Sequence, residues 1–402
     1  MAELTEEEKE ILRRAKAIQR KVEEDVDQVP DDFGEPVKKK RSSANNRNTS
    51  ANHRSASAKG SSTSEGRKTS GSSRKQGKQS ARSSGKKKNK TRRIGRFLWK
   101  CIFILLLLLA VLYVAARYIA AKVDYQPYTT EYVRGADVMS KPWVKNILVM
   151  GTDERNSDET TRSDAMILLS INERSRKITM TSILRDCYVP IAGHGENRIN
   201  TAYRFGGAAL TVQTIEENFK IAIDGYVKID FYSFVDIVDA VGGVWIDVDE
   251  GEKEYVNGYL NEINALLGAE FGDGYLQETG NLLLNGKQAL SYARIRYIGS
   301  DFQRTERQRE IVEAVLKQAK TLNPVKLYRL TDTVLPEVVT DLDDHTLAVM
   351  MMKAIFYLGY DMEQNRIPMD GTWSNSSIDG KAVLQIDFNA NIQGIQDIIY
   401  GE

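Results

Sequence analysis

An unbroken apolar run just before residue 120 constrains this chain more than any other feature. Sixteen consecutive residues between Lys100 and Arg117 carry no charge, and five of them in a row are leucine. Counted over residues 97–121, the segment reaches the roughly 20 residues that a helix needs to cross a bilayer. Aromatic and basic residues at both ends are typical of the interfaces of such a span. The run therefore predicts one transmembrane helix.

Two other interpretations of the run are less favoured. A buried helix of a soluble protein usually keeps some polar face, and five adjacent leucines leave none. A cleaved signal peptide begins close to the N-terminus and ends at a small-x-small site. Here almost a hundred residues precede the run and no clean cleavage site follows it.

The charge balance predicts the orientation of the span. Residues 36–100 contain 21 Lys or Arg and a single acid, Glu65. Twelve of these bases lie between Arg74 and Lys100, whereas the first twenty residues after Ala116 contain three. Because basic residues stay on the cytoplasmic side, we expect the N-terminus inside and residues 123–402 outside. The prediction is a single-pass signal anchor in the cell membrane, with its catalytic domain extracellular.

Residues 1–96 are predicted to be a cytoplasmic tail. Residues 5–26 have the pattern of an acidic helix with a thin apolar stripe. Residues 37–96 are rich in Ser, Lys, Arg, Gly and Asn and contain no Phe, Trp or Tyr, so we expect them to be disordered. Next to a membrane span, this basic segment is expected to lie against the anionic inner leaflet. It contains no folded DNA reader, so no specific nucleic-acid partner is predicted.

The part of the chain after the span alternates between short apolar runs of strand length and amphipathic segments. This pattern predicts an α/β domain with a mixed central sheet flanked by helices. We expect a linker at 122–144, a catalytic domain at 145–322 and a C-terminal part at 323–402. Strands are predicted at 147–150, 165–171, 178–182, 226–229, 244–248 and 382–387. Helices are predicted at 211–219, 231–241, 287–293, 303–322, 391–400 and, as a buried helix, 348–359, with an irregular insertion at 251–279.

Arginine and aspartate recur at the predicted strand ends, as in Gly151–Arg155, Arg162–Asp164 and Ser182–Asp186. Guanidinium groups bind phosphate oxygens in pairs, and carboxylates bind Mg²⁺. The pattern therefore fits a polyanion with a hard metal, and it fits surface salt-bridge networks equally well. Arg307 and Arg309 are predicted on a solvated helix face and are left out of the candidate site.

The cysteine, histidine and serine residues argue against a disulfide in the outer domain, a zinc site, a nucleophilic cysteine and a serine hydrolase. Cys101 and Cys187 are the two cysteines, and one of them lies in the predicted span, so no disulfide is expected within the outer domain. An exported domain without disulfides favours a Gram-positive surface. His194 lacks a second histidine for zinc and is a poor partner for a nucleophilic cysteine. Ser182 lacks the context of a Ser-His-Asp hydrolase.

Several of these motifs occur together in one order. They are Asn146–Arg155, Arg162–Asp164, Ser182–Asp186, Arg198–Asn200 and the group Arg294, Arg296, Asp301, Arg304, Arg307 and Gln308. In order and spacing the chain resembles the LytR-CpsA-Psr family of cell-envelope proteins across about residues 145–320. The basic tail and single anchor resemble that family as well. The chain departs from the family pattern at Leu184, where proline is usual, at Arg198, where lysine is usual, and at Ala165, where threonine is usual.

The resemblance implies an enzyme outside the membrane that moves a phosphoglycan from a polyprenyl-pyrophosphate carrier to peptidoglycan muramic acid. The phosphoglycan would be teichoic-acid-like, capsular or another wall polymer. Mg²⁺ would be held by Asp153 and Asp164, and the catalytic residues would be Arg185 and Asp186. A pyrophosphatase side activity is also implied. The pyrophosphate would be bound by Arg155, Arg162, Arg198, Asn200, Tyr203, Arg294, Arg296, Arg304 and Gln308.

Two non-enzymatic alternatives remain open. A membrane-bound transcriptional attenuator would use the basic tail on DNA, where binding through phosphates is strongly salt-dependent. A glycan-binding or scaffolding protein would use the outer domain without catalysis. The sequence identifies neither the polymer, the general base, the residues lining a prenyl tunnel nor the oligomeric state.

Overall fold

The computed structural model describes residues 85–127, 132–152, 163–296, 301–323, 326 and 334–401, and side chains from residue 97 onward, Asp164 excepted. The predicted acidic helix 5–26 lies outside these residues, as does the predicted disordered segment up to residue 84. The described residues fall into two compact units, one ending at Leu108 and the other beginning at Leu109.

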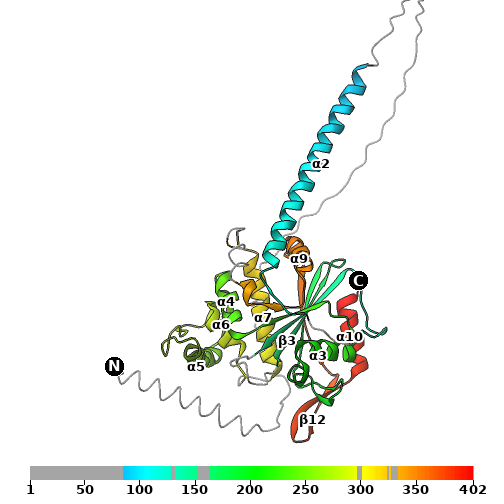
Figure 1. Cartoon of the computed structure of the whole chain (residues 1–402). Helices are drawn as coiled ribbons and strands as arrows, with labels where there is room; N and C mark the ends of the chain where they lie inside the picture. Colours follow the sequence, from blue (N-terminus) through cyan, green and yellow to red (C-terminus); the bar gives the residue numbers. More distant parts are fainter. Residues whose placement is uncertain are drawn as a thin grey trace, which may run out of the picture. The chain divides into compact units, whose positions relative to one another are not determined.

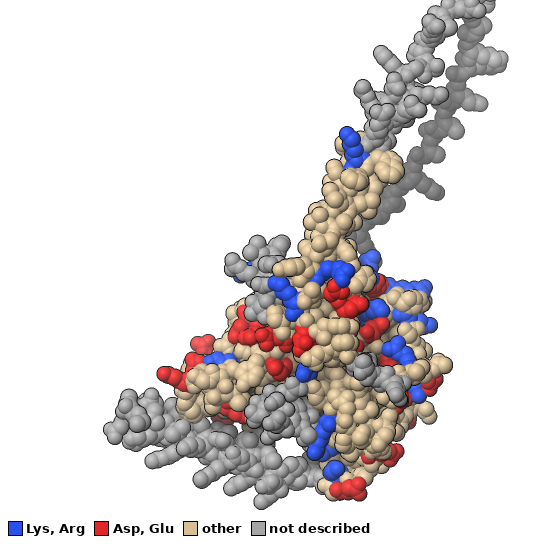
Figure 2. Space-filling model, in the orientation of Figure 1, with Lys and Arg blue, Asp and Glu red and all other residues tan. Residues whose placement is uncertain are grey.

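Helix α2 (Gly85–Ala120) contains the apolar run (Figure 1). Its segment Phe97–Ala120 is 24 residues long with a mean hydropathy of 2.7, which is long and apolar enough to cross a membrane. Large apolar side chains such as Phe103 and Leu106 are exposed along it. Between Lys100 and Arg117 its visible surface carries no basic or acidic side chain (Figure 2). The predicted position of the helix is confirmed.

A seven-stranded mixed sheet forms the centre of the second unit, in the order β1-β10-β7-β2-β3-β4-β11. Strand β2 pairs antiparallel with β3 and parallel with β7, β3 pairs antiparallel with β4, and β11 pairs parallel with β4. The central strands β2, β3 and β4 are largely buried and contain many Ile, Leu, Val and Met residues, whereas the edge strands β1 and β11 are more exposed. The strand bounds are Asp124–Tyr125 (β1), Val144–Thr152 (β2), Ser163–Asn172 (β3), Lys177–Ile183 (β4), Gly225–Ile229 (β7), Val339–Thr340 (β10) and Asp361–Ile367 (β11).

Helices cover both faces of this sheet, so the predicted α/β class is confirmed (Figure 1). On one face α3 (Thr201–Phe219) and α10 (Phe388–Tyr400) enclose a core around Leu148, Leu168 and Phe219. On the other face α4 (Phe231–Val241), α6 (Gly286–Ala293) and α7 (Asp301–Ala319) enclose a second core. Because β10 and β11 belong to the sheet, residues after 334 complete the same sheet as residues 144–229.

The segment 251–279 was predicted to be an irregular insertion, and this was wrong for its first part, whereas residues 267–279 contain no helix or strand. It begins with the regular helix α5 (Glu250–Leu266), which starts at a capping box between Asp249 and Glu252. Buried residues at helical spacing, including Val256, Leu260 and Ile263, face the neighbouring helices. The segment then leads into β9 (Gly280–Leu284), which pairs with β8 (Val244–Val248).

Helix α9 (Asp344–Tyr357) was predicted to be buried, and this too was wrong. Only Ala348 among its residues is buried, and Ile355 and Phe356 are 74% and 67% exposed. Met351 and Met352 pack against a small apolar cluster, in agreement with a structural role. The short 3-10 helix η1 (Leu335–Glu337) precedes β10.

Two small hairpins lie at the end of the sheet where β4 and β11 finish. One consists of β5 (Tyr188–Ile191) and β6 (Gly195–Arg198), and the other of β12 (Trp373–Ile378) and β13 (Lys381–Ile386). A bridge between Cys187 and Leu384 joins them. They border the turn that carries Arg185 and Asp186.

Candidate functional site

The turn after β4 presents Arg185 and Asp186, and its backbone is held from two sides. The Arg185 carbonyl accepts a hydrogen bond from Asn200 N at 3.3 Å, and the Asp186 carbonyl accepts one from Leu384 N at 2.9 Å. Leu184, at the position where the family usually has proline, is 2% exposed and its N–H bonds Ile367 O at 2.8 Å. These bonds fix the turn without a proline, so Arg185 starts from a rigid backbone.

Four further charged contacts surround this turn and form the Arg185 cluster, which consists of Arg185, Asp186, Arg198, Asp301 and Arg304. Arg185 Nε lies 2.9 Å from Asp301 Oδ2 and 3.4 Å from Asp186 Oδ2. Arg198 Nη1 donates to Asp186 Oδ1 at 3.2 Å. Arg304 Nη1 lies 3.5 Å from Asp301 Oδ1. Residues from β4, β6 and α7 thus meet at one end of the sheet, as the spacing of the motifs predicts.

The two carboxyls of the cluster have shifted pKa values of opposite sign. Burial raises the pKa of Asp186, and the neighbouring Asp301 raises it further against the opposing charges of Arg185 and Arg198. Burial also acts to raise the pKa of Asp301, but Arg304 and Arg185 outweigh it and hold that pKa below its ordinary value. Two neighbouring carboxyls whose pKa values differ in this way can hold one proton and one negative charge side by side.

Asp301 is the residue of this cluster that the sequence analysis did not assign to the site. It begins α7 and bonds Arg185 directly, so it orients the guanidinium. Its place three residues before Arg304 was the available signal, because residues three apart share a helix face.

Arg307 and Arg309 are buried, with 6% and 7% exposure, so their predicted solvated position is wrong. Arg307 Nε donates to Glu252 Oε1 at 3.0 Å. Arg309 Nη1 donates to Ser182 Oγ at 2.7 Å, and its Nε donates to Gln364 Oε1 at 3.2 Å. Helix α7 lies between the sheet and the layer formed by α4 to α6, so these two arginines are covered although they are charged.

An aromatic stack stands next to the cluster. The rings of Phe302 and Trp373 lie 4.9 Å apart, and the Arg366 guanidinium lies 4.4 Å from the Phe302 ring centre. Burial lowers the pKa of Arg309 to about 10, and the charge of Arg366 adds to this effect. Arg366 therefore adds positive charge next to the Arg185 cluster, and positive charge favours an anionic ligand.

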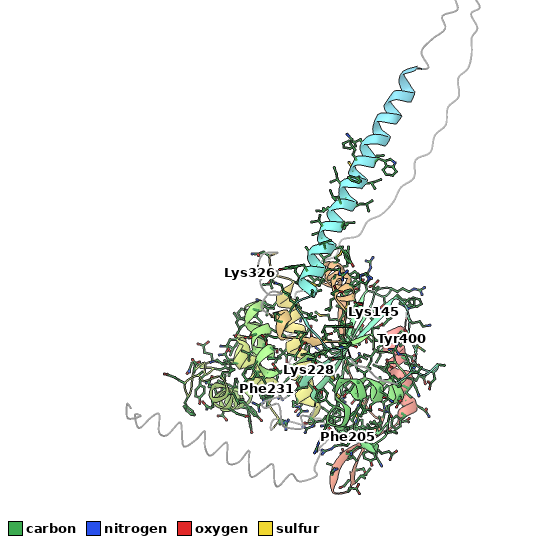
Figure 3. All side chains as sticks on the ribbon, viewed as in Figure 1. Lys145, Phe205, Lys228, Phe231, Lys326 and Tyr400 are labelled. Atoms are coloured by element: carbon green, nitrogen blue, oxygen red, sulfur yellow. The ribbon has the colours of Figure 1, made fainter. Side chains whose placement is uncertain are left out.

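Arg294 is placed differently from the other predicted residues. Its Nη2 donates to Glu262 Oε1 at 3.0 Å, and its guanidinium lies 5.0 Å from the ring centre of Phe231 (labelled in Figure 3) and 5.3 Å from that of Tyr259. These contacts place it among α4, α5 and α6, and no described contact joins it to the Arg185 cluster. Phe231 also lines a shallow apolar pocket between these helices, together with Tyr232, Val235, Ile263, Leu266, Leu267 and Leu290.

The remaining described candidates lie around the cluster. Arg296 is exposed, and its charge contributes to the low pKa of Asp301. Asn200 is 3% exposed at the start of α3, and its Oδ1 is buried without a hydrogen-bond partner among the described residues. Tyr203 packs half-buried against the core, and Gln308 is half-buried on α7.

The predicted metal ligands cannot be placed by side chain. Asp153 lies outside the described residues, with Arg155 and Arg162, and Asp164 is described only as backbone within β3. Thr152, the last described residue of β2, pairs with Ser163, the first residue of β3, at the end of the sheet where β4 leads into Arg185. Among the described residues, no group of three or more His, Cys, Asp or Glu side chains could hold a metal.

The fold and the cluster together define an α/β domain with an arginine- and aspartate-lined site, in a chain that also carries one long apolar helix. The chain belongs to the LytR_cpsA_psr family, whose model matches residues 117–394. The family resemblance inferred from the motifs is thereby confirmed.

Named relatives agree with this assignment. The chain is 37% identical over 215 residues to a polyisoprenyl-teichoic acid–peptidoglycan teichoic acid transferase TagU of Oceanobacillus iheyensis, covering 51% of this chain and 61% of that protein. It is 32% identical over 246 residues to the TagU of Enterococcus faecalis, covering 58% of this chain and 75% of that protein. The solved structure of TagT bound to LI-WTA is 25% identical with a TM-score of 0.53, covering 67% of this chain and 98% of that one.

Proposed function

We propose that this protein transfers a phosphoglycan from a polyprenyl-pyrophosphate carrier to a muramic-acid hydroxyl of peptidoglycan. The observation that carries the proposal is the Arg185 cluster, in which three arginines and two aspartates meet at strand ends held by backbone hydrogen bonds. The names of the TagU relatives describe the transfer of teichoic acid from a polyisoprenyl-linked form to peptidoglycan. A wall teichoic acid is therefore the first donor to test.

The proposed reaction is a displacement at phosphorus. The acceptor oxygen forms a bond to the phosphorus that carries the glycan, and the bond from that phosphorus to the prenyl-phosphate oxygen breaks. The leaving prenyl phosphate and the transferring group are both negative, so Arg185, Arg198 and Arg304 stabilise charge as the bond breaks. Catalysis consists mainly of positioning and charge stabilisation.

Asp186 is proposed as the acceptor of the hydroxyl proton. Its side chain is 15% exposed, and its pKa is raised by burial and by Asp301, which makes it a stronger base than an ordinary aspartate. Asp301 stays ionised beside it and orients Arg185. When water replaces the acceptor, the same arrangement would hydrolyse the pyrophosphate as a side reaction.

Mg²⁺ is proposed as the cofactor, held by Asp153 and Asp164. The carboxyls of Asp186 and Asp301 already pair with arginines, so a metal needs other ligands. Thr152 and Ser163, which precede these two aspartates in the sequence, are paired on adjoining strands, and the buried Thr152 Oγ1 has no partner among the described residues. These features fit a hard, oxygen-liganded cation, which when bound would neutralise pyrophosphate charge.

The proposed location is the outer face of the cell membrane, with α2 as a single span and the N-terminus inside. The uncharged surface of α2 and the excess of Lys and Arg before it support this orientation. In this arrangement the Arg185 cluster faces the wall compartment, where peptidoglycan is available.

The test uses the full chain in nanodiscs with a synthetic lipid-linked donor and peptidoglycan oligomers. We expect transfer with Mg²⁺, loss of transfer with EDTA, and loss in Asp153→Ala and Asp164→Ala, while Glu278→Ala, an exposed control, stays active. Activity surviving in both aspartate variants contradicts the metal assignment. Binding of the donor without any transfer under all conditions contradicts the enzymatic proposal and favours a glycan-binding scaffold.

A further inference from the structure

Helix α9 carries an apolar stripe that is covered at its start and uncovered at its end. The α9 stripe consists of Ala348, Met351, Met352, Ile355 and Phe356, at the i, i+3, i+4, i+7 and i+8 spacing of one helix face. Exposure rises along it from 0% at Ala348 to 74% at Ile355 and 67% at Phe356. Two adjacent large apolar side chains with this much exposure indicate a surface that contacts another protein or a membrane.

The covered part of the stripe packs against the last turns of α2. Ala348 forms a small apolar cluster with Ala116 and Ala120, and Met351 and Met352 pack against it. Alanines at the crossing allow the two helices to approach closely. The α9 stripe is therefore continuous with the apolar surface of the predicted membrane span.

Polar contacts fix the depth at which the two helices meet. Tyr113 OH lies 2.6 Å from His345 Nδ1, and Arg117 Nε donates to Asp344 Oδ2 at 2.9 Å. At a rise of 1.5 Å per residue, the twenty residues from Phe97 to Ala116 are about 30 Å long, the thickness of a hydrocarbon core. Helix α9 thus begins where that core ends.

The opposite side of α9 is held to the sheet. Lys353 Nζ and Tyr357 Oη both bond Glu173 Oε1, at 2.6 and 2.8 Å, in the turn between β3 and β4. Ile355 is two positions from each of them, which places it on the other side of the helix. Its side chain therefore points away from the sheet.

The same end of the sheet carries an aromatic residue between two cations. The ring of Trp143, just before β2, has Lys141 Nζ at 5.8 Å and the Arg174 guanidinium at 5.2 Å from its centre. Lys145 lies in the same part of the molecule (Figure 3). Tryptophan with basic neighbours is typical of the headgroup layer of a bilayer.

We propose that the uncovered end of the α9 stripe lies in the headgroup layer of the membrane that α2 spans. The domain then touches the bilayer twice, through α2 and through α9, as interfacial amphipathic helices do. The proposal rests on α2 being a membrane anchor, as proposed above. It does not depend on the reaction assigned to the Arg185 cluster.

This contact would set the distance between the site and the membrane. Strand β4 begins at Lys177, beside the Glu173 turn, and ends at Ile183, just before Arg185. Seven strand residues extend roughly 20 Å at about 3.3 Å each. With α9 on the bilayer, the Arg185 cluster lies at the far end of the sheet and faces the wall.

The test measures membrane depth in the full chain in nanodiscs. In a Cys101→Ser background, Phe356→Cys is labelled with nitrobenzoxadiazole, since Cys187 is 0% exposed and unreactive. We expect most of the emission to be lost with nitroxide-headgroup lipids. Phe205→Cys is the control, because Phe205 is 41% exposed and lies far from α9 in Figure 3. A label at this position should keep its emission.

Leu106→Cys in α2 separates failure of the proposal from failure of the anchor. It should be quenched by lipids with the nitroxide deep in the acyl chain. An unquenched label at 356 with a quenched label at 106 overturns the proposal, because the stripe is then in water or under protein. An unquenched label at 106 shows that α2 does not span, and it overturns the proposed anchor together with the contact that rests on it.

Discussion

Arg185 has a position that no other cation in the described part of the chain shares. Its Nε approaches both carboxyls of the cluster, and its backbone is fixed by the bonds of Asn200 and Leu184. A guanidinium has a planar fork of N–H donors that can bind two phosphate oxygens together. Lysine carries the same charge but lacks this planar geometry.

We therefore predict that Arg185→Lys is nearly as inactive as Arg185→Ala. Loss of one such donor costs about 3–4 kcal/mol of transition-state stabilisation, or roughly a hundred- to thousandfold in rate. The melting temperature should change little in Arg185→Lys, because the side chain is 23% exposed and lysine keeps the charge between the aspartates. Turnover and melting are measured on the same preparations. Near-normal turnover removes Arg185 from the catalytic residues, and a large melting loss makes it a structural ion pair.

The pKa shifts of the two aspartates predict the acidic side of the pH profile. Because the pKa of Asp186 is raised, its base form is lost at a higher pH than for an ordinary aspartate of about 3.9. Asp301→Asn removes a negative neighbour, so the pKa of Asp186 falls and the acidic limb of kcat/KM moves to lower pH. Glu278→Gln serves as the exposed control. A limb that stays in place in Asp301→Asn argues against Asp186 as the base.

The same shifts have opposite effects on stability. The raised pKa of Asp186 favours the folded state below the unfolded pKa, and this contribution is lost as pH rises through the folded value. The lowered pKa of Asp301 contributes above the unfolded pKa and is lost as pH falls through the folded value. The pair therefore stabilises the fold most when Asp186 is protonated and Asp301 is ionised. Asp186 must lose this proton before it can act as the base.

At the scale of elements, α7 shows how a charged helix can be part of a core. Three of its arginines, Arg304, Arg307 and Arg309, are buried. Arg307 lies over the ring of Tyr292 at 5.9 Å and bonds Glu252, which is itself 4% exposed and part of the α5 capping box. This buried ion pair links α7 to the start of α5.

We predict that Arg307→Met destabilises the fold by about 3–5 kcal/mol, because it leaves the Glu252 carboxylate buried without its partner. Lys317→Met on the same helix removes an exposed pair with Glu313 and should cost about 0–1 kcal/mol. Thermal melting of the two variants beside wild type makes the comparison. Equal melting temperatures would mean that Arg307 is solvated, as the sequence pattern suggests.

The elements also show which features of the fold can be predicted from sequence. Strands β2, β3 and β4 have continuous apolar runs, so local pattern located them to within a few residues, and α4 and β8 have the predicted bounds. Burial of Arg307 depends on Glu252, 55 residues away, and a helical periodicity cannot report such a partner. The exposure of Ile355 and Phe356 was not predicted either. An apolar helix is usually expected in a core, whereas α9 packs against the last turns of α2.

Some of the predicted site residues meet in the structure and Arg294 does not join them, and this difference has a physical reason. Arg185, Asp186 and Arg198 come together because strand ends meet at one end of the sheet, and Arg304 joins them from α7 through Asp301. Arg294 follows α6 rather than a strand, and its partner Glu262 lies in the helix that the sequence pattern did not reveal. Asp153, Arg155 and Arg162 remain predictions.

At the scale of the whole molecule, the chain divides by charge at its span. Residues 36–100 carry 21 Lys or Arg and one acid, whereas arginines in the described part after α2, such as Arg185 and Arg307, pair with aspartates and glutamates. The Arg185 cluster draws every described contact from residues after 180. Nothing in that geometry requires the first 84 residues.

We predict that deletion of residues 2–84, which keeps α2 whole, leaves transfer to peptidoglycan unchanged in nanodiscs. The reason is that the residues proposed for positioning and charge stabilisation lie on or next to β4, β6 and α7, while in the proposed orientation the removed segment lies at the inner leaflet. Arg185→Ala in the same truncated chain is the inactive control. In cells, the truncated protein should still attach wall polymer when its membrane abundance is matched to that of the full chain. Loss of attachment at matched abundance, with transfer intact in nanodiscs, would assign the basic tail a regulatory role. Loss in both assays would contradict an outer domain that works alone.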